Sequence, residues 1–247
     1  MRIVRFSDGS SPCYGALDDG STRIVGLKGD PLFAAVEPSG RVFELDEVRL
    51  LSPVIPRSKV VGVAGNYSDQ PVPDADRTRP PLFLKANTSV IGPDDPIAIP
   101  AWSDDVVFEG ELAVVIGRDC RNVPEAAALD VVRGYACFND VTARELQRVD
   151  GQWTRGKGFD GFAPLGPCLL MQREMPAEAV LCTRLNGRVV QEARLGEMIF
   201  GVPRIIAHIS RFATLRAGDV IATGTPSGVG PVHDGDSVEV EIEGIGV

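Results

Sequence analysis

The chain alternates between short apolar runs and polar, glycine-rich or proline-rich segments, and most of the runs have the length of strands. Residues 2–6 and 22–27 alternate apolar and polar positions between clusters of Gly, Asp, Ser and Pro, which indicates a small β-rich unit. Residues 59–65 and 131–139 are more continuously apolar, as expected of strands covered on both faces. The pattern predicts a mostly β protein of the α+β class.

The second half of the chain carries the clearest helix and hairpin signals. Apolar residues recur at helical spacing over 203–213, which predicts an amphipathic helix. Shorter helices are expected at 124–129 and from 142 to 148, with Pro in the first turn of the former. Asn186-Gly187 predicts a hairpin turn, and strict alternation over 238–243 predicts a half-exposed strand.

Proline positions divide the chain into two predicted domains. Pro53 and Pro56 flank a linker, so we expect a small N-terminal domain at 1–55 and a larger domain at 56–247. Residues 66–80 form a polar segment with several prolines, and a loop of that length in a compact domain is more often functional than accidental. We expect this loop to act as a lid.

Composition and charge exclude several function classes. The 247 residues are 44% hydrophobic, and their formal net charge of -9 disfavours nucleic-acid binding, which requires a basic surface. There is no apolar run of the ~20 residues that a membrane span needs and no signal-peptide pattern, so we expect a cytoplasmic protein that does not bind membranes. Five widely spaced cysteines are expected to be reduced thiols.

Two glutamates one residue apart are the most informative candidate for chemistry. Glu109 and Glu111 lie within the strand-like run 106–116, and residues i and i+2 of a strand point to the same face. A wet edge strand would also accept this pattern, but the continuous apolar run 112–116 favours a strand covered on both faces. Two buried like charges need a positive group between them, which favours a divalent metal ion.

Asp140 is the candidate for a third carboxylate ligand, because it ends the apolar strand before it. Three carboxylates suit a hard cation such as magnesium, manganese or calcium better than zinc. Asp140 can instead be the N-cap of the helix expected from 142 onwards. Both interpretations stay open at this stage.

Lys157 and a glycine-rich turn are further candidates. Residues 151–157 formally match G-x-x-x-x-G-K, but Gly158 follows where a phosphate loop requires Ser or Thr, so nucleotide binding is rejected. Lys157, flanked by glycines and aromatics, is either a proton carrier whose pKa is lowered near a metal or a surface lysine. Residues 223–230 are either a carboxylate-binding nest of backbone amides or an ordinary tight turn. His208 and His233 are expected at the surface.

Six blocks in the correct order resemble the fumarylacetoacetate hydrolase family, and together they extend over nearly all of residues 56–246. Each block alone is weak, whereas the ordered set is specific. The blocks are Val63-Ala64-Gly65-Asn66-Tyr67, Pro81-Leu82-Phe83-Leu84-Lys85, Phe108-Glu109-Gly110-Glu111-Leu112, Asn139-Asp140-Val141-Thr142-Ala143-Arg144, Trp153-Thr154-Arg155-Gly156-Lys157-Gly158-Phe159-Asp160 and Thr223-Gly224-Thr225-Pro226-Ser227-Gly228-Val229-Gly230.

The resemblance implies a mixed β-roll or β-sandwich catalytic domain, usually a homodimer, behind a small N-terminal domain. It implies that Glu109, Glu111 and Asp140 bind Mg²⁺ or Mn²⁺. The substrate it implies is a small anionic 2-oxo acid that bears a further carbonyl or enol. The catalytic positions that it implies are Lys157, Arg144 and Gln147, and its substrate-binding positions are Thr225, Gly224, Asn66 and Tyr67.

The chain departs from the pattern of hydrolytic members, which resembles N-Y-x-x-H-x-x-E. Gln70 and Pro73 stand at the His and Glu positions, and neither side chain can serve as a general base at neutral pH. Phe108 also stands where members often carry Tyr. We therefore expect a metal-dependent isomerase or tautomerase of a 2-oxo or 2-hydroxydienoic diacid such as 2-hydroxyhepta-2,4-diene-1,7-dioate, acting through a metal-bound enolate in aromatic-acid breakdown.

Two alternatives remain open. One is C–C bond hydrolysis of an acylpyruvate or decarboxylation of oxaloacetate, with Asp69 or another lid residue as the base. The other is a catalytically idle binding protein that has kept the fold and lost the chemistry of the lid. The residues do not choose between Mg²⁺ and Mn²⁺.

Overall fold

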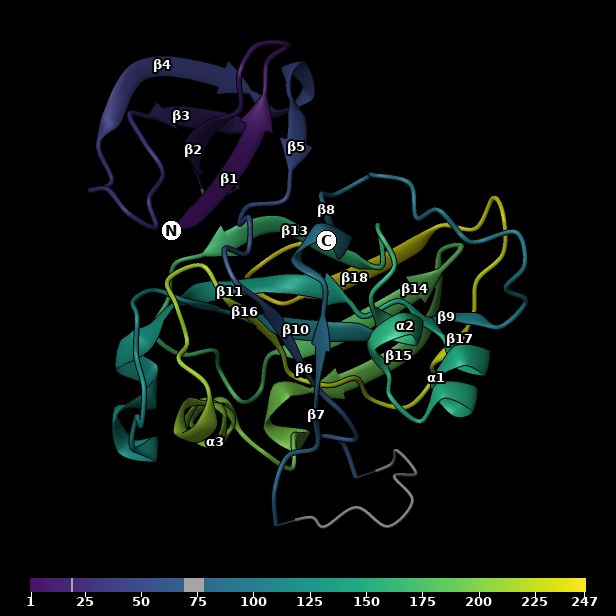
Figure 1. The fold of residues 1–247 in the computed structure, drawn as a ribbon. Coiled ribbons are helices and arrows are strands. Elements are labelled where there is room, and N and C mark those ends of the chain that lie inside the picture. The colour runs from purple at the N-terminus through teal and green to yellow at the C-terminus, as the bar shows by residue number, and fades with distance from the viewer. Residues whose placement is uncertain (19, 69–77) are drawn as a thin grey trace.

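The computed structural model describes residues 1–18, 20–68 and 78–247, and strands dominate it (Figure 1). The strands are β1 (Arg2–Ser7), β2 (Cys13–Leu17), β3 (Arg23–Leu27), β4 (Pro38–Glu44), β5 (Arg49–Leu51), β6 (Val60–Val63), β7 (Leu82–Lys85), β8 (Val90–Ile91), β9 (Val106–Phe108), β10 (Gly110–Ile116), β11 (Val132–Asn139), β12 (Thr142–Ala143), β13 (Ala163–Leu170), β14 (Val180–Leu185), β15 (Arg188–Arg194), β16 (Val220–Ala222), β17 (Gly230–Pro231) and β18 (Val238–Ile242). The helices are α1 (Arg144–Asp150), α2 (Thr154–Lys157) and α3 (Val202–Phe212), with 3₁₀ turns η1 (Leu45–Glu47), η2 (Asn87–Ser89), η3 (Glu125–Val131) and η4 (Leu195–Glu197). The prediction of a mostly β fold is confirmed.

One large mixed sheet joins the N-terminal strands to strands from the middle of the chain. Its strand order is β4-β3-β2-β1-β13-β11-β10-β16-β6-β7, with β5 paired to β1 and β8 paired to β13. The N-terminal strands, purple and blue in Figure 1, join the rest because β1 pairs antiparallel with β13. Two smaller sheets, β12-β9-β17 and β15-β14-β18, complete the fold.

The buried apolar side chains cover both faces of the large sheet. One cluster joins β10 and β11 to α3 and η3, and another covers the opposite face with small side chains such as Ala113, Ala136 and Ala222. A third cluster lies under β9 and α1. The expectation that β10 is covered on both faces is confirmed, since every residue of this strand is buried.

The predicted strand over 106–116 is wrong in one respect, because it is interrupted at Glu109. β9 belongs to a small sheet, whereas β10 pairs with β11 and β16 in the large one. At the crossing, where the chain passes from β9 to β10 at Glu109 and Gly110, side chains replace neighbouring strands as hydrogen-bond acceptors. The Glu109 N–H donates to Asn139 Oδ1 and the Gly110 N–H to Gln191 Oε1, each at 3.0 Å. Buried backbone groups thus stay satisfied while the chain changes sheets.

Gly110 is required at this crossing because there is no room for a side chain. A Cβ added to it would lie 2.0 Å from Thr183 Oγ1 on β14. The close approach brings β14 against the segment between the two glutamates. Gly110 is thus the point where the small sheet β15-β14-β18 supports the crossing.

Other local predictions meet mixed outcomes. The helix expected from 142 begins instead at Arg144, because Thr142 and Ala143 pair with β9 as strand β12. The segment after Pro124 is a 3₁₀ helix rather than an α-helix. The hairpin turn is confirmed, since Asn186 and Gly187 both have positive φ (51° and 77°), which favours a turn that follows the twist of the strands.

The helix α3 confirms the amphipathic prediction and gives a test of the core. Ile206 is fully buried in it, whereas Phe212 at its end is 61% exposed. We expect Ile206→Ala to lower the free energy of unfolding by about 2–5 kcal/mol, because it leaves a cavity in the core. Phe212→Ala should change it by less than about 0.5 kcal/mol. Urea denaturation of both variants measures the difference, and equal losses would contradict this assignment of the core.

Candidate functional site

Three buried carboxylates converge at the crossing between the sheets. Glu109 lies between β9 and β10, Glu111 is on β10, and Asp140 directly follows β11. One oxygen atom from each lies within 4.8 Å of the others. The predicted convergence of the two glutamates and Asp140 is therefore observed. The N-cap alternative for Asp140 does not hold, because Ala143 precedes the first residue of α1.

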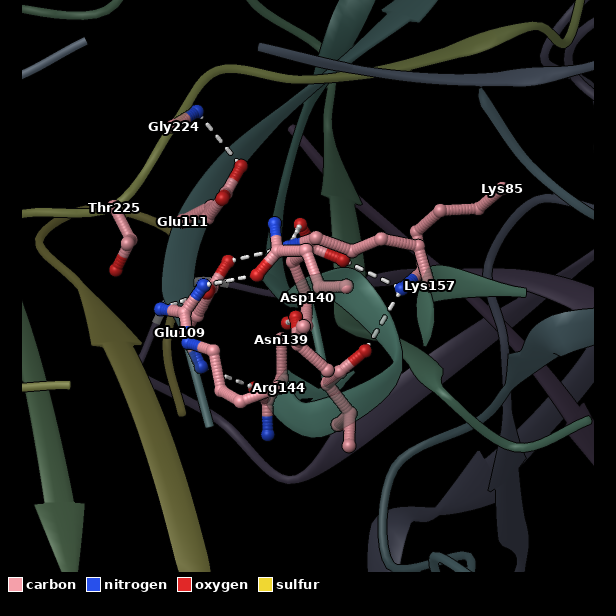
Figure 2. Close-up of polar contacts among 12 residues, drawn as sticks. Lys85, Glu109, Glu111, Asn139, Asp140, Arg144, Lys157, Gly224 and Thr225 are labelled. Atoms are coloured by element: carbon pink, nitrogen blue, oxygen red, sulfur yellow. Dashed lines mark hydrogen bonds and ion pairs between the residues drawn. The ribbon is translucent and has the colours of Figure 1, made fainter. Parts of the chain in front are cut away.

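Lys157 lies between two of these carboxylates. Its Nζ is 2.7 Å from Glu109 Oε2 and 2.5 Å from Asp140 Oδ2, and the side chain is 2% exposed (Figure 2). The helix α2 supplies this residue, and a Cβ at Gly156 would lie 2.9 Å from Ala143 O, so α2 lies close to the backbone before α1. The alternative of a surface lysine is excluded by this burial.

Lys85 is a second buried lysine to which the sequence reasoning gave no role. Its Nζ lies 2.5 Å from Asp140 Oδ1 and donates to Val141 O at 3.0 Å, and its side chain is fully buried. The available signal was a lysine that ends the apolar run of β7. Such a position places an ammonium group inside the protein, where it needs an anionic partner.

Arg144 and Gln147 lie on α1 at the edge of the cluster. Arg144 Nη2 is 2.7 Å from Glu109 Oε1, and Arg144 Nη1 donates to Gln147 Oε1 at 2.7 Å. The Arg144 side chain is 26% exposed, so it is the cation of this cluster that solvent reaches best. The structure thus brings both predicted residues to the site, with Gln147 orienting the guanidinium.

Glu111 is held by the glycine-rich turn after β16. The Gly224 N–H donates to Glu111 Oε2 at 2.7 Å, as Figure 2 shows. The Thr225 hydroxyl donates to Gly110 O and accepts from Gln191 Nε2, both at 2.8 Å. The predicted nest therefore binds a carboxylate, but that carboxylate belongs to the protein. Gln191, which sequence reasoning missed, links this turn to the crossing strand.

Asn66 supports the site rather than lining it. Its side chain is fully buried, donates to Phe200 O and Thr223 O, and accepts from the Phe200 N–H. These bonds occupy the amide and hold the chain next to Gly224, so this geometry does not support a substrate-binding role. Tyr67 is also buried, and its backbone forms an isolated antiparallel β-bridge with Met198. Gln70, Pro73 and Asp69 lie in the predicted lid, within residues 69–77, outside the part that the structure describes.

Burial and neighbouring charges shift the pKa values of the three carboxylates in different directions. Burial raises the pKa of Glu111 well above its ordinary value, and the nearby Asp140 and Glu109 raise it further. Burial also raises the pKa of Glu109, although Lys157 opposes it. Burial acts on Asp140 in the same sense, but Lys157 and Lys85 outweigh it and lower its pKa. Asp140 is thus the carboxylate best stabilised in its charged form.

The pKa values of the two buried lysines shift in opposite directions. Burial lowers the pKa of Lys157, but Asp140 and Glu109 outweigh burial and raise it above its ordinary value. The lowered pKa that we expect near a metal ion concerns the metal-bound site and stays a prediction. Burial dominates at Lys85 and lowers its pKa. Of the two lysines, Lys157 therefore holds its proton, and so its positive charge, more strongly.

The residues present fit a hard divalent cation. All ligand atoms in the cluster are carboxylate oxygens, which Mg²⁺ and Mn²⁺ prefer. Among the described residues Glu111 has no ion-pair partner, although it is buried and close to two other carboxylates. A buried carboxylate without a cation is costly, and a metal ion would remove that cost. Neither histidine belongs to this cluster.

Within the described ranges 1–18, 20–68 and 78–247, the helices lack the length and apolar character of a membrane-spanning helix. The five cysteines are free thiols, as expected. Of the two histidines, His233 is exposed as predicted, whereas His208 is half-buried on α3.

Replacing Glu111 separates metal binding from folding. We expect Glu111→Gln to weaken Mn²⁺ binding by more than about tenfold, the lower end of what outer-shell substitutions cost. The same change should stabilise the protein in EDTA. Because the pKa of Glu111 is raised in the folded state, wild-type stability falls as pH rises from the unfolded value near ~4.3 through the folded pKa. The gain should therefore be larger at pH 8 than at pH 5.

Calorimetric Mn²⁺ titration and urea denaturation in EDTA measure the two effects. The exposed Glu125→Gln provides the control and should change neither. A variant at position 111 that binds Mn²⁺ normally would contradict the assignment of Glu111 as a ligand.

Lys85 provides a test of charge compensation. We expect Lys85→Met to lower the free energy of unfolding by about 3 kcal/mol, because it removes one partner of a buried ion pair. Arg155→Met breaks the exposed pair with Asp150 and should have a much smaller effect. Chemical denaturation compares the two, and a Lys85→Met protein as stable as wild type would show that Asp140 does not need this lysine.

Comparison with known proteins agrees with this geometry. A sequence model of the fumarylacetoacetate (FAA) hydrolase C-terminal family matches residues 58–247, and one described as Rv2993c-like, N-terminal, matches residues 1–53. Protein Rv2993c from Mycobacterium tuberculosis is 49% identical over 257 residues, which cover 100% of this chain and 96% of that protein.

Two solved structures show the same fold. The structure of 2-hydroxyhepta-2,4-diene-1,7-dioate isomerase from Mycobacterium marinum has a TM-score of 0.91 and 43% identity, covering 100% of this chain and 95% of that one. The structure of maleylpyruvate hydrolase from Sphingobium sp. SYK-6, in complex with manganese (II) ion and pyruvate, has a TM-score of 0.82 and 29% identity, covering 100% and 96%. The chain belongs to the fumarylacetoacetate hydrolase family, whose members include isomerases and hydrolases.

Proposed function

We propose that this protein is a metal-dependent isomerase or tautomerase of a 2-oxo or 2-hydroxydienoic diacid. The observation that carries the proposal is the buried ammonium group of Lys157, in contact with Glu109 and Asp140 beside the third carboxylate. A lysine in contact with two of these carboxylates would lie beside a 2-oxo acid bound to a metal ion at this cluster. A positioned lysine can carry a proton in such a reaction.

Glu109, Glu111 and Asp140 would hold the Mg²⁺ or Mn²⁺ ion. When bound, the ion would polarise the 2-oxygen of the substrate and favour its enol form. The complex of the maleylpyruvate hydrolase with manganese and pyruvate supports both the type of ion and the type of ligand.

Arg144 would bind a substrate carboxylate. Its guanidinium is partly exposed, and it is fixed by Glu109 on one side and Gln147 on the other. A planar guanidinium held in this way presents its remaining N–H groups to an incoming carboxylate. Lys157, further inside, would then transfer the proton between carbon atoms of the aligned substrate.

The sequence of the predicted lid favours a proton shift over hydrolysis. Gln70 and Pro73 replace the His and Glu that activate water in hydrolytic members of the family. A tautomerisation needs no attacking water, so it tolerates the loss of this pair. The similarity to an isomerase of a hydroxydienoate agrees with this preference.

C–C bond hydrolysis or oxaloacetate decarboxylation is the second candidate. The similarity to a maleylpyruvate hydrolase favours it, and Asp69 or another lid residue would have to replace the missing base. A binding protein without turnover is a third possibility, which would keep the ligand site and lose the reaction.

Parallel assays with Mn²⁺ separate these candidates. We expect 2-hydroxyhepta-2,4-diene-1,7-dioate to isomerise faster than an acylpyruvate is cleaved or oxaloacetate loses CO₂. Lys157→Met should reduce this turnover by about 10²–10⁴-fold, because it removes the proton carrier. Oxalate, which chelates without reacting, should still bind to this variant.

Three results would change the conclusion. Rapid cleavage of the acylpyruvate would favour the hydrolase, and rapid loss of CO₂ from oxaloacetate would favour the decarboxylase. Oxalate binding with no turnover of any substrate would favour the binding protein. Substituting the exposed Lys28 with Met is the matched control and should leave the rates unchanged.

A further inference from the structure

A pair of aromatic side chains, one of which contacts Lys157, has no part in the chemistry described so far. Phe83 is on β7 and Trp153 directly precedes α2, and their ring centroids are 5.6 Å apart with a tilt of 57°. Lys157 Nζ lies 4.6 Å from the centroid of the Phe83 ring. The aromatic pair therefore borders the polar cluster directly.

The Phe83 ring is held in place by the neighbouring strand. Phe83 and Gly62 are directly opposed across β6 and β7, and a Cβ at Gly62 would lie 2.0 Å from Phe83 Cζ. Gly62 thus leaves the space in which the ring lies. Both Phe83 and Trp153 are only half-buried, so part of their apolar surface remains open to a ligand.

The other neighbours of Lys157 Nζ are polar and already paired. Glu109 and Asp140 contact it directly, Arg144 lies beyond Glu109, and Lys85 lies beyond Asp140. A substrate atom that reaches Nζ therefore has charged groups on these sides and the aromatic pair on another. The aromatic pair is the apolar surface beside the group that would move the proton.

We propose that Phe83 and Trp153 select the substrate by packing against its planar, unsaturated segment beyond the 2-oxo acid. This inference rests on the proposed function and specifies its substrate class. A conjugated chain presents a flat π-face, which stacks on an aromatic ring better than a flexible saturated chain does. The common 2-oxo acid end binds at the carboxylates and Arg144, whereas the aromatic pair distinguishes one acid from another.

A purely structural role for the pair is the competing explanation, in which Phe83 and Trp153 only hold α2 against β7. That role predicts that all ligands respond equally to substitution of the rings. Selection by the rings predicts that a ligand confined to the carboxylate cluster does not respond, while one with a conjugated tail does.

Calorimetric binding in the presence of Mn²⁺ tests the proposal without turnover. The probes are oxalate, 2-oxohex-3-enoate, whose tail is planar and conjugated with the 2-oxo group, and 2-oxohexanoate, in which that tail is saturated. Wild type should bind the unsaturated acid at least threefold more tightly than the saturated one. Phe83→Leu and Trp153→Leu should each weaken binding of the unsaturated acid by about tenfold, because each removes an aromatic face on which the tail stacks. Oxalate affinity should change less than twofold.

Trp102→Leu is the matched control, since it removes a 61% exposed tryptophan that contacts Phe159 rather than Phe83. It should leave all three affinities unchanged. Equal losses for oxalate and the conjugated acid, or no preference of wild type for the unsaturated tail, would overturn the selection by the rings. Failure of wild type to bind oxalate would instead overturn the proposed function, and this inference with it.

Discussion

The compensation of three buried carboxylates by three cationic side chains is the constraint on which this site depends. Glu109, Glu111 and Asp140 are almost inaccessible to solvent, and the positive groups beside them are Lys157, Lys85 and Arg144. The compensation is uneven, because Asp140 contacts two lysines, whereas within the described part of the chain the Glu111 carboxylate has the Gly224 amide as its polar partner. Burial without a cation makes Glu111 the least stable of the three when charged. A divalent ion would bring its largest benefit there.

The fold brings these groups together by moving one segment from a small sheet to the large one. A regular strand through Glu109 was the natural expectation, since apolar residues flank both glutamates. The crossing depends on the amide oxygens of Asn139 and Gln191, which accept backbone N–H groups from positions distant in sequence. Periodicity reports which positions are buried and therefore predicted the strands and α3 well. It carries no information on which sheet each half of a strand joins, because that choice depends on tertiary partners.

The candidate site was predictable where residue type alone restricts the chemistry. Acidic residues in apolar surroundings are rare unless they are paired or metal-bound, and this rule identified the carboxylates before any geometry was known. Lys85 follows the same logic but has a single charge at a strand end, a pattern that surface strands share. Asn66 was assigned to the substrate from its motif, whereas its amide hydrogen-bonds to the backbone of two other segments. A motif marks a position as special without stating whether its side chain faces the ligand or the protein.

The cluster of charges and the aromatic pair have different consequences for specificity. In the proposed function, a carboxylate triad with an arginine at its edge would recognise the end that all 2-oxo acids share, so it would not by itself distinguish a diene from a short keto acid. Discrimination requires contacts that only one of them can make. The rings of Phe83 and Trp153 are the half-buried apolar surface that contacts or adjoins Lys157, and their position is set by Gly62 and by the start of α2. On the proposed function, chemistry and selection would therefore rest on separate groups that meet at one lysine, so either could vary while the other is retained.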